Sequence, residues 1–155
     1  MSINDNATFK QLAQTFISSG NQTISSIQAY LYKVGSPNTT DTITAEIWSN
    51  NTGTNQPGSL LSTGSVQISQ ISTAGSYVSI TIASVNLTKS TSYWLVLRAS
   101  YAGNASNLVA WAETSGTTDV ATDGQAYYVN YVGGASYQTV GANRDFTYRI
   151  GDCGQ

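Results

Sequence analysis

Two glutamates lie close to tryptophans in the sequence. Glu46 stands two residues before Trp48, and Glu113 stands two residues after Trp111. A pair of carboxylates can hydrolyse glycosides, with one acting as acid and the other as base or nucleophile. The neighbouring tryptophans could hold a sugar ring, because each offers a flat apolar body with a polar edge. Nothing in the sequence marks a raised pKa or a cleft, so we interpret both glutamates as solvated carboxylates and expect no enzymatic activity.

Other reactive residue types are scarce. The chain has no histidine, so neither a Ser-His-Asp nor a Cys-His arrangement can form. Zinc sites and disulfide scaffolds need more histidine or cysteine than this chain has. The single cysteine, Cys153, is interpreted as a free thiol without a role, and a disulfide to another chain is the alternative.

One loop offers oxygen ligands. Asp119 and Asp123 lie four residues apart, directly before Gly124. Calcium takes several oxygen ligands, which a loop with two carboxylates and free carbonyls can supply. The spacing differs from that of an EF-hand, and a polar loop that ends in an Asp-Gly turn explains the same residues. We therefore expect no metal and no cofactor, and keep Asp119 and Asp123 as weak calcium candidates.

Aromatic residues are the richest chemical feature. The chain has 10 tyrosines and 3 tryptophans, against 3 phenylalanines. Both tyrosine and tryptophan suit wet protein interfaces and the faces of sugars. In a strand Tyr127 and Tyr131 share one face, which predicts a tyrosine surface for a partner protein. Trp48 and Trp111 are the candidates for stacking on a glycan.

The charge of the chain excludes several partners. Only 9% of the 155 residues are charged, and the net charge is −2. Nucleic-acid binders that neutralise phosphates need clustered lysine and arginine, so we expect no nucleic acid. No apolar stretch reaches the roughly 18 residues of a transmembrane helix, so we expect no membrane partner. The first ten residues lack the basic and apolar parts of a secretory signal, which predicts synthesis in the cytoplasm without a signal peptide.

The elements that must position these residues are β-strands. Apolar residues recur at period two, as Ile43, Ala45 and Ile47 do against Glu46 and Trp48. The strand at 92–99 is apolar on both faces, which predicts a central strand covered twice. The other strands are expected at or near residues 23–34, 76–83, 9–17, 64–69, 107–113, 125–132 and 144–150. The pattern predicts an all-β fold, an antiparallel β-sandwich of jelly-roll type with about nine strands and no substantial helix.

Turn residues separate these strands. The run from Gly35 to Asn38 follows one strand, and Pro57-Gly58 follows another. Proline presets φ and glycine takes φ > 0, as a type II turn demands, which predicts a turn at Pro57-Gly58.

The chain divides into one domain and two short ends. Residues 9–150 form the predicted β-sandwich domain, and residues 151–155 form a C-terminal tail. Residues 1–8 are polar and form an N-terminal arm, which either frays or lies on a neighbouring subunit. On the second interpretation, the arm around Ile3 is a contact for a partner.

Three stretches carry a resemblance to known proteins. They are the strand that ends in Lys-Val-Gly-Ser-Pro, the run from Ile43 to Gly58 with its Pro-Gly, and the Tyr-Trp strand from Ser92 to Leu97. Together they resemble a jelly-roll module of phage virion accessory proteins and bacterial surface proteins, over roughly residues 9–112. Such modules occur in capsid decoration proteins, in tail fibres and as carbohydrate-binding-like appendages. They share no catalytic residues.

The resemblance implies a structural role first. It implies a capsid decoration (cement) protein that bridges capsid subunits on the outer surface of the virion and stabilises the mature head. The expected partners are the major capsid protein or other virion subunits, and analogy with decoration proteins implies a homotrimer. The alternative is a glycan-binding module for host or surface attachment, in a tail fibre or a secreted appendage.

Overall fold

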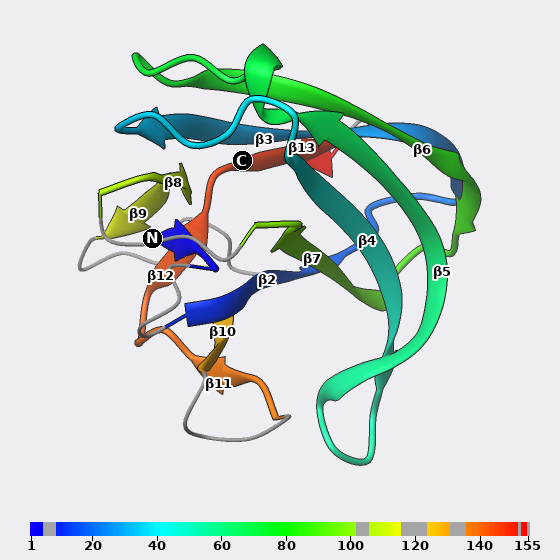
Figure 1. The fold of residues 1–155 in the computed structure, drawn as a ribbon. Coiled ribbons are helices and arrows are strands. Elements are labelled where there is room, and N and C mark those ends of the chain that lie inside the picture. Colours follow the sequence, from blue (N-terminus) through cyan, green and yellow to red (C-terminus); the bar gives the residue numbers. More distant parts are fainter. Residues whose placement is uncertain (5–8, 102–105, 116–123, 131–135, 152, 155) are drawn as a thin grey trace.

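The protein is an all-β structure of antiparallel sheets packed face to face (Figure 1). The computed structural model describes residues 1–155 except 5–8, 102–105, 116–123, 131–135, 152 and 155. Within the described residues there is no α-helix, and η1 (Ile68–Gln70) is a single 3-10 turn. The predicted all-β class and the predicted absence of a substantial helix are confirmed for this part of the chain.

The first sheet is built on the long strand β3. Among the described strands it has six members, and β3 pairs with β6 along one side and with β8 and β13 along the other. Two short strands extend the outer edge, β1 beside β8 and β14 beside β13. The members are β1 (Ser2–Ile3), β3 (Gln22–Val34), β6 (Ser76–Leu87), β8 (Leu108–Trp111), β13 (Tyr148–Ile150) and β14 (Cys153–Gly154).

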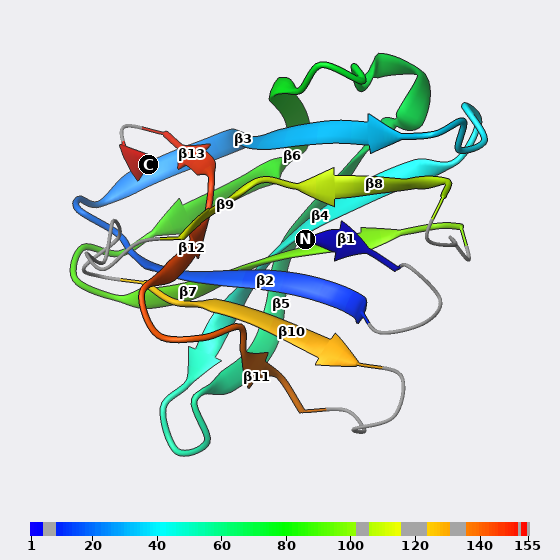
Figure 2. The ribbon, with the colours of Figure 1, turned by 90° about the vertical axis from the view of Figure 1, so that its left-hand side faces the viewer.

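The second sheet carries the features that matter for function. Its described strands follow the order β11-β10-β2-β7-β4-β5, so that β7 lies in the interior of the sheet. The members are β2 (Phe9–Ile17), β4 (Thr42–Asn51), β5 (Gln56–Gln67), β7 (Ser92–Ala99), β10 (Ala126–Asn130) and β11 (Gln138–Thr139). A separate pair, β9 (Glu113–Ser115) and β12 (Arg144–Phe146), lies beside these sheets. Figure 2 shows the two sheets as layers, with β10, β11 and the β4–β5 hairpin at one end.

The core lies between the sheets and follows the predicted alternation. Ile43, Ala45 and Ile47 of β4 are fully buried in it. The alternating apolar residues of β3 and β6 are buried as well, namely Ile27, Ala29, Leu31, Val78, Ile80 and Ile82. Trp111 and Phe146 stack at 4.4 Å between ring centroids with an interplanar angle of 14°. Burying aromatic surface of this size is a large part of what holds such a domain together.

The sandwich is closed along one side where β5 crosses β6. These are edge strands of different sheets, and their backbones approach so closely that a methyl group on Gly64 would overlap the carbonyl oxygen of Thr81. The hydroxyl of Ser62 donates to the carbonyl of Ala83 at the same crossing. A glycine is needed here because only hydrogen fits between the two backbones.

The N-terminal residues belong to the fold, which corrects the expectation of an arm that begins at residue 1. Ile3 pairs with Val109 and is 0% exposed, because β1 extends the first sheet. The hydroxyl of Tyr101 donates to the carbonyl of Ile3 at 2.9 Å and accepts from the N–H of Val109 at 2.7 Å. The side chain of Ile3 therefore contributes to the chain's own core and is not exposed for a partner. Residues 5–8 of the predicted arm lie outside the described residues.

The C-terminal residues are likewise attached to the sheet, since Cys153 pairs with Ile150 through the backbone.

Two details of the strand prediction are wrong. More strands are present than the nine expected, because short segments such as β1 and β11 pair at the sheet edges. The turn expected at Pro57-Gly58 lies earlier, between the ends of β4 and β5. There the N–H of Asn55 donates to the carbonyl of Asn51 at 2.7 Å, and Asn55 takes a φ of 48°. Asparagine tolerates this left-handed conformation, so the position with positive φ needs no glycine.

Candidate functional site

The outer face of the second sheet, turned away from the core, carries an apolar cluster of its own. In β7, Trp94 and Val96 alternate with the core residues Leu95 and Leu97, and all four are fully buried. Ala13 of the neighbouring strand β2 joins the outer cluster. The sequence predicted a central strand covered on both faces here, and β7 confirms it.

Two tyrosines cover Trp94. The ring of Tyr127 lies 4.5 Å from that of Trp94 between centroids, and the ring of Tyr137 lies 5.5 Å away. The indole N–H of Trp94 donates to Asn50 Oδ1 at 2.8 Å, and Asn55 Nδ2 donates to the Tyr127 hydroxyl at 3.1 Å. Since both asparagines flank the turn of the β4–β5 hairpin, this hairpin holds the aromatic cluster in place.

Tyr137 is fixed from two sides. Gln56, the first residue of β5, accepts from the backbone N–H of Tyr137 at 2.7 Å and donates to its carbonyl at 3.2 Å. The Tyr137 hydroxyl donates to Gln11 Oε1 at 2.6 Å. Burial raises the pKa of the Tyr137 phenol, so the hydroxyl keeps the proton that this hydrogen bond uses. Two residues that are distant in the sequence, Gln11 and Gln56, thus hold Tyr137 in place.

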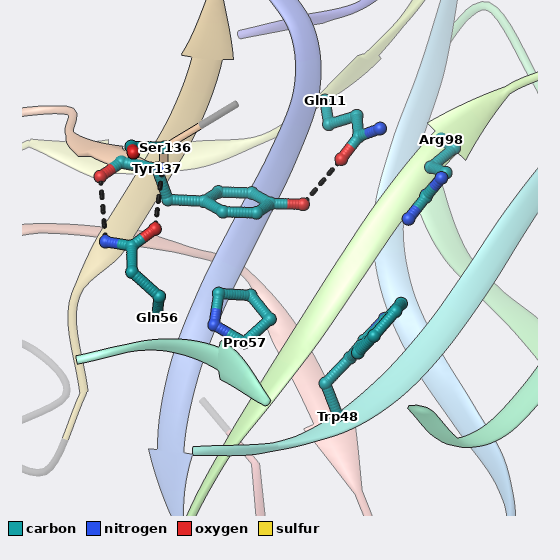
Figure 3. Close-up of a pocket in the computed structure, with 7 residues that line it drawn as sticks. All are labelled: Gln11, Trp48, Gln56, Pro57, Arg98, Ser136 and Tyr137. Atoms are coloured by element: carbon teal, nitrogen blue, oxygen red, sulfur yellow. Dashed lines mark hydrogen bonds between the residues drawn. The ribbon is translucent and has the colours of Figure 1, made fainter. Parts of the chain in front are cut away.

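Beside Tyr137 the surface is hollowed to a volume of about 290 Å³. Figure 3 shows the hollow, with the rings of Tyr137 and Trp48 on its walls. Its volume is at the small end of ligand sites, which span about 300–1,000 Å³. Such a site suits a ligand of one or two rings. The residues that line it are Gln11, Trp48, Gln56, Pro57, Arg98, Ser136 and Tyr137.

Glu46 connects the two largest side chains on one side of the hollow. The indole N–H of Trp48 donates to Glu46 Oε2 at 2.8 Å, and Arg98 Nη2 lies 3.0 Å from the same oxygen. The Glu46 side chain is 11% exposed and that of Arg98 is 40% exposed, so this ion pair is partly shielded from water. Glu46, Trp48 and Arg98 are thus linked through their side chains. The hydrogen bond from the edge of the indole to Glu46 fixes the orientation of the Trp48 ring.

The pairing of β4 with β5 is irregular at Trp48. The register of the ladder shifts on both sides of this residue, between Ile47 and Trp48 and again before Asn50. At both shifts the extra residue belongs to β5, and a bulge of this kind bends the strand that carries it. Trp48 still lies on the outer face, and its ring is only partly buried against the aromatic cluster.

No family model matches this chain, and no curated protein matches it. The site is therefore interpreted from its own geometry.

The structure separates the two tryptophans that the sequence offered for stacking on a glycan. Trp48 borders the hollow, as a binding residue should. Trp111 is fully buried in the core, and its indole N–H donates to the carbonyl of Thr147 at 2.9 Å. It is therefore not accessible to a glycan, because both faces of β8 are covered.

Of the two tyrosines predicted to form a surface for a partner, the one that the structure describes is largely buried. Tyr127 is 8% exposed and packs on Trp94, so it supports the floor of the site more than it offers a contact of its own. Tyr131 lies outside the described residues. So do Asp119 and Asp123, the calcium candidates.

The two glutamates considered for hydrolysis do not form a pair. Glu46 is bound by Arg98 and Trp48, whereas Glu113 lies 3.1 Å from Arg144 Nη1 on a different pair of strands.

In the described part of the chain, no group of three or more histidine, cysteine, aspartate or glutamate residues could hold a metal ion. Among the same residues, no helix has the length and apolar character to cross a bilayer.

Several residues of the site were not identified from the sequence. They are Gln11, Gln56, Arg98 and Tyr137. The alternation did put Glu46 and Trp48 on one face of their strand, and Trp94 and Arg98 on one face of theirs. The sequence does not reveal that β4 pairs with β7, and only this pairing brings the two outer faces together.

Proposed function

We propose that this chain is a glycan-binding module without catalytic activity. The observation that carries the proposal is the partly exposed ring of Trp48 beside a small hollow lined by amides, a guanidinium and hydroxyls. A sugar ring presents apolar C–H groups on its face and hydroxyls around its rim. The apolar face fits an aromatic wall, and the hydroxyls fit polar groups that converge on the same space.

The rigidity of the site supports the same function. Trp48 is oriented by Glu46, and Tyr137 is fixed through Gln56 and Gln11. Side chains that are already ordered lose little entropy when they bind, which matters for a small ligand with few contacts.

The jelly-roll topology is a further part of the proposal. Apart from the β4–β5 hairpin, which lies within the second sheet, consecutive strands from β2 to β8 alternate between the sheets: β2, β4, β5 and β7 belong to the second sheet, and β3, β6 and β8 to the first. This alternation supports a jelly roll, the architecture that the resemblance in the sequence implied.

A substitution of Trp48 tests the proposed function. We expect the wild-type protein to bind at least one glycan on an array, and W48A to weaken that binding about tenfold or more, about 1.4 kcal/mol. The matched control is Y77A, since Tyr77 stacks edge-on with Tyr30 at 5.4 Å on the outer face of the other sheet. Equal binding by W48A and the wild type, or no binding of any glycan by the wild type, would contradict the proposal.

A capsid decoration protein is the second candidate. It is supported by the edge strand β5, where Leu60 and Leu61 are 47% and 40% exposed. Exposed leucines on an edge strand suit a contact with another protein. In this role the chain would form a homotrimer on the virion surface and bind capsid subunits.

Light scattering tests the second candidate. The expected result is a trimer that the double variant L60S and L61S converts to a monomer. A wild-type monomer at every concentration would count against it.

A further inference from the structure

We propose that the hollow beside Trp48 binds a neutral sugar residue rather than an acidic one, an inference that rests on the proposed glycan binding. The charges at the site favour a neutral ligand. Of the described residues that line the hollow, Arg98 is the one with a formal charge, and the carboxylate of Glu46 lies 3.0 Å from its guanidinium. The positive and the negative charge cancel at short range.

The guanidinium is not free to hold a carboxylate in the usual way. Arginine binds carboxylates best with two parallel N–H groups, in a fork that meets both oxygens. Arg98 already directs Nη2 to Glu46. An acidic sugar at the same place would meet the negative charge of Glu46, whose Oε2 also accepts from Trp48. Repulsion between the two carboxylates opposes such a ligand.

A neutral sugar finds both donors and acceptors here. No described residue engages Gln11 Nε2, which points toward Arg98 in Figure 3. Glu46 does not itself line the hollow, but its side-chain contacts with Trp48 and Arg98 both use Oε2, which leaves Oε1 as an acceptor next to two residues that do line it. Neighbouring hydroxyls on a sugar both donate and accept, so an amide N–H and a carboxylate oxygen together match such a pair.

One donor at the site lacks a partner. Arg98 Nε is buried and has no hydrogen-bond partner among the described residues. Buried polar groups are almost always satisfied, and an exception calls for a missing partner. Because this nitrogen is closed to solvent, an acceptor reaches it only if the Arg98 side chain shifts when a ligand binds, and a neutral sugar hydroxyl is an acceptor that Glu46 would not repel.

The size of the hollow limits how much of a glycan it can hold. A volume of about 290 Å³ accommodates one sugar ring in contact with Trp48 and leaves the rest of a chain in solvent. We therefore expect recognition of a single exposed neutral hexose, with modest affinity.

Matched glycans test this inference. Lactose, maltose, cellobiose and mannobiose serve as neutral probes, and glucuronic acid, galacturonic acid and sialyllactose serve as acidic ones. We expect at least one neutral probe to bind about tenfold or more tightly than every acidic probe in calorimetry. This binding should change little between low and high salt, because screening acts on charges. Tighter binding of an acidic probe would overturn the inference and leave glycan binding intact, whereas silence of all probes and of the array would overturn glycan binding itself.

The variant E46Q tests the role of the ion pair. Removing the carboxylate charge frees Arg98, so we expect weaker binding of the neutral probe and a gain of several-fold or more for an acidic probe. The matched control is E113Q, which removes the same charge from the Glu113–Arg144 pair, away from the hollow. Unchanged preference in E46Q, with E113Q also unchanged and both proteins folded, would overturn the inference.

Discussion

At the scale of single residues, the site depends on a few polar side chains that hold aromatic rings in place. Glu46 illustrates this, since one oxygen orients Trp48 and pairs with Arg98. Gln56 plays the same part for Tyr137 through two hydrogen bonds to its backbone. These side chains are long and would be mobile if isolated, so their mutual contacts determine the shape of the hollow.

The ionisation of Tyr137 provides a prediction at this scale. Its pKa is raised above the ordinary value near 10, mainly by burial. A phenol with a raised pKa in the folded state keeps its proton where the unfolded chain has lost it. Its contribution to stability is therefore present below about pH 10 and falls as the pH rises above that value.

The measurement is an alkaline titration of tyrosinate absorbance in the wild type and in Y137F. We expect the two folded proteins to give the same curve up to the pH at which they unfold, because Tyr137 does not ionise while folded. We also expect the stability of the wild type to fall more steeply above about pH 10 than that of Y137F. One fewer ionising group near pH 10 in folded Y137F would show that the pKa of Tyr137 is not raised.

At the scale of elements, the crossing of β5 over β6 sets the position of the hairpin that shapes the site. Gly64 permits the crossing, and the same strand β5 begins with Gln56 at the hollow. We expect G64A to destabilise the protein by about 2–3 kcal/mol, since an added methyl group must push the two backbones apart.

Chemical denaturation measures this effect, and the chain offers a matched control. An added methyl group on Gly20 meets nothing within 4 Å, so G20A should leave the free energy of unfolding within about 0.5 kcal/mol of the wild type. If G64A is as stable as G20A, the close approach of the two strands is not as described.

The elements also show what the sequence could predict. The alternation in β3, β4, β6 and β7 was sufficient to predict the buried faces, because one face of each strand must meet the core. The hairpin turn was misplaced because Pro57-Gly58 has typical turn residues, whereas Asn55 can adopt a positive φ without glycine. The strand β1 is too short for any pattern, and only its pairing with β8 buries Ile3.

At the scale of the whole molecule, the second sheet separates two apolar regions. On its inner face lies the core shared with the first sheet, and on its outer face lies the cluster around Trp94. A site that rests on a sheet covered in this way is held by rigid elements, which favours precise geometry.

The same arrangement explains why the sequence around each tryptophan does not reveal whether that tryptophan lies at the surface or in the core. Trp48 and Trp111 both stand beside a glutamate, yet only the packing of the sheets places one at the surface and the other in the core.

The indole N–H signals of the 3 tryptophans report directly on contact between Trp48 and a bound sugar. A proton–nitrogen correlation spectrum, with the Trp48 signal assigned by the variant W48F, is recorded while the best-binding neutral sugar is added. We expect the Trp48 signal to move and saturate, because its N–H bonds to Glu46 at the edge of the hollow, while the signal of the buried Trp111 stays in place. Saturable binding that leaves the Trp48 signal unmoved would show that the sugar does not bind at Trp48.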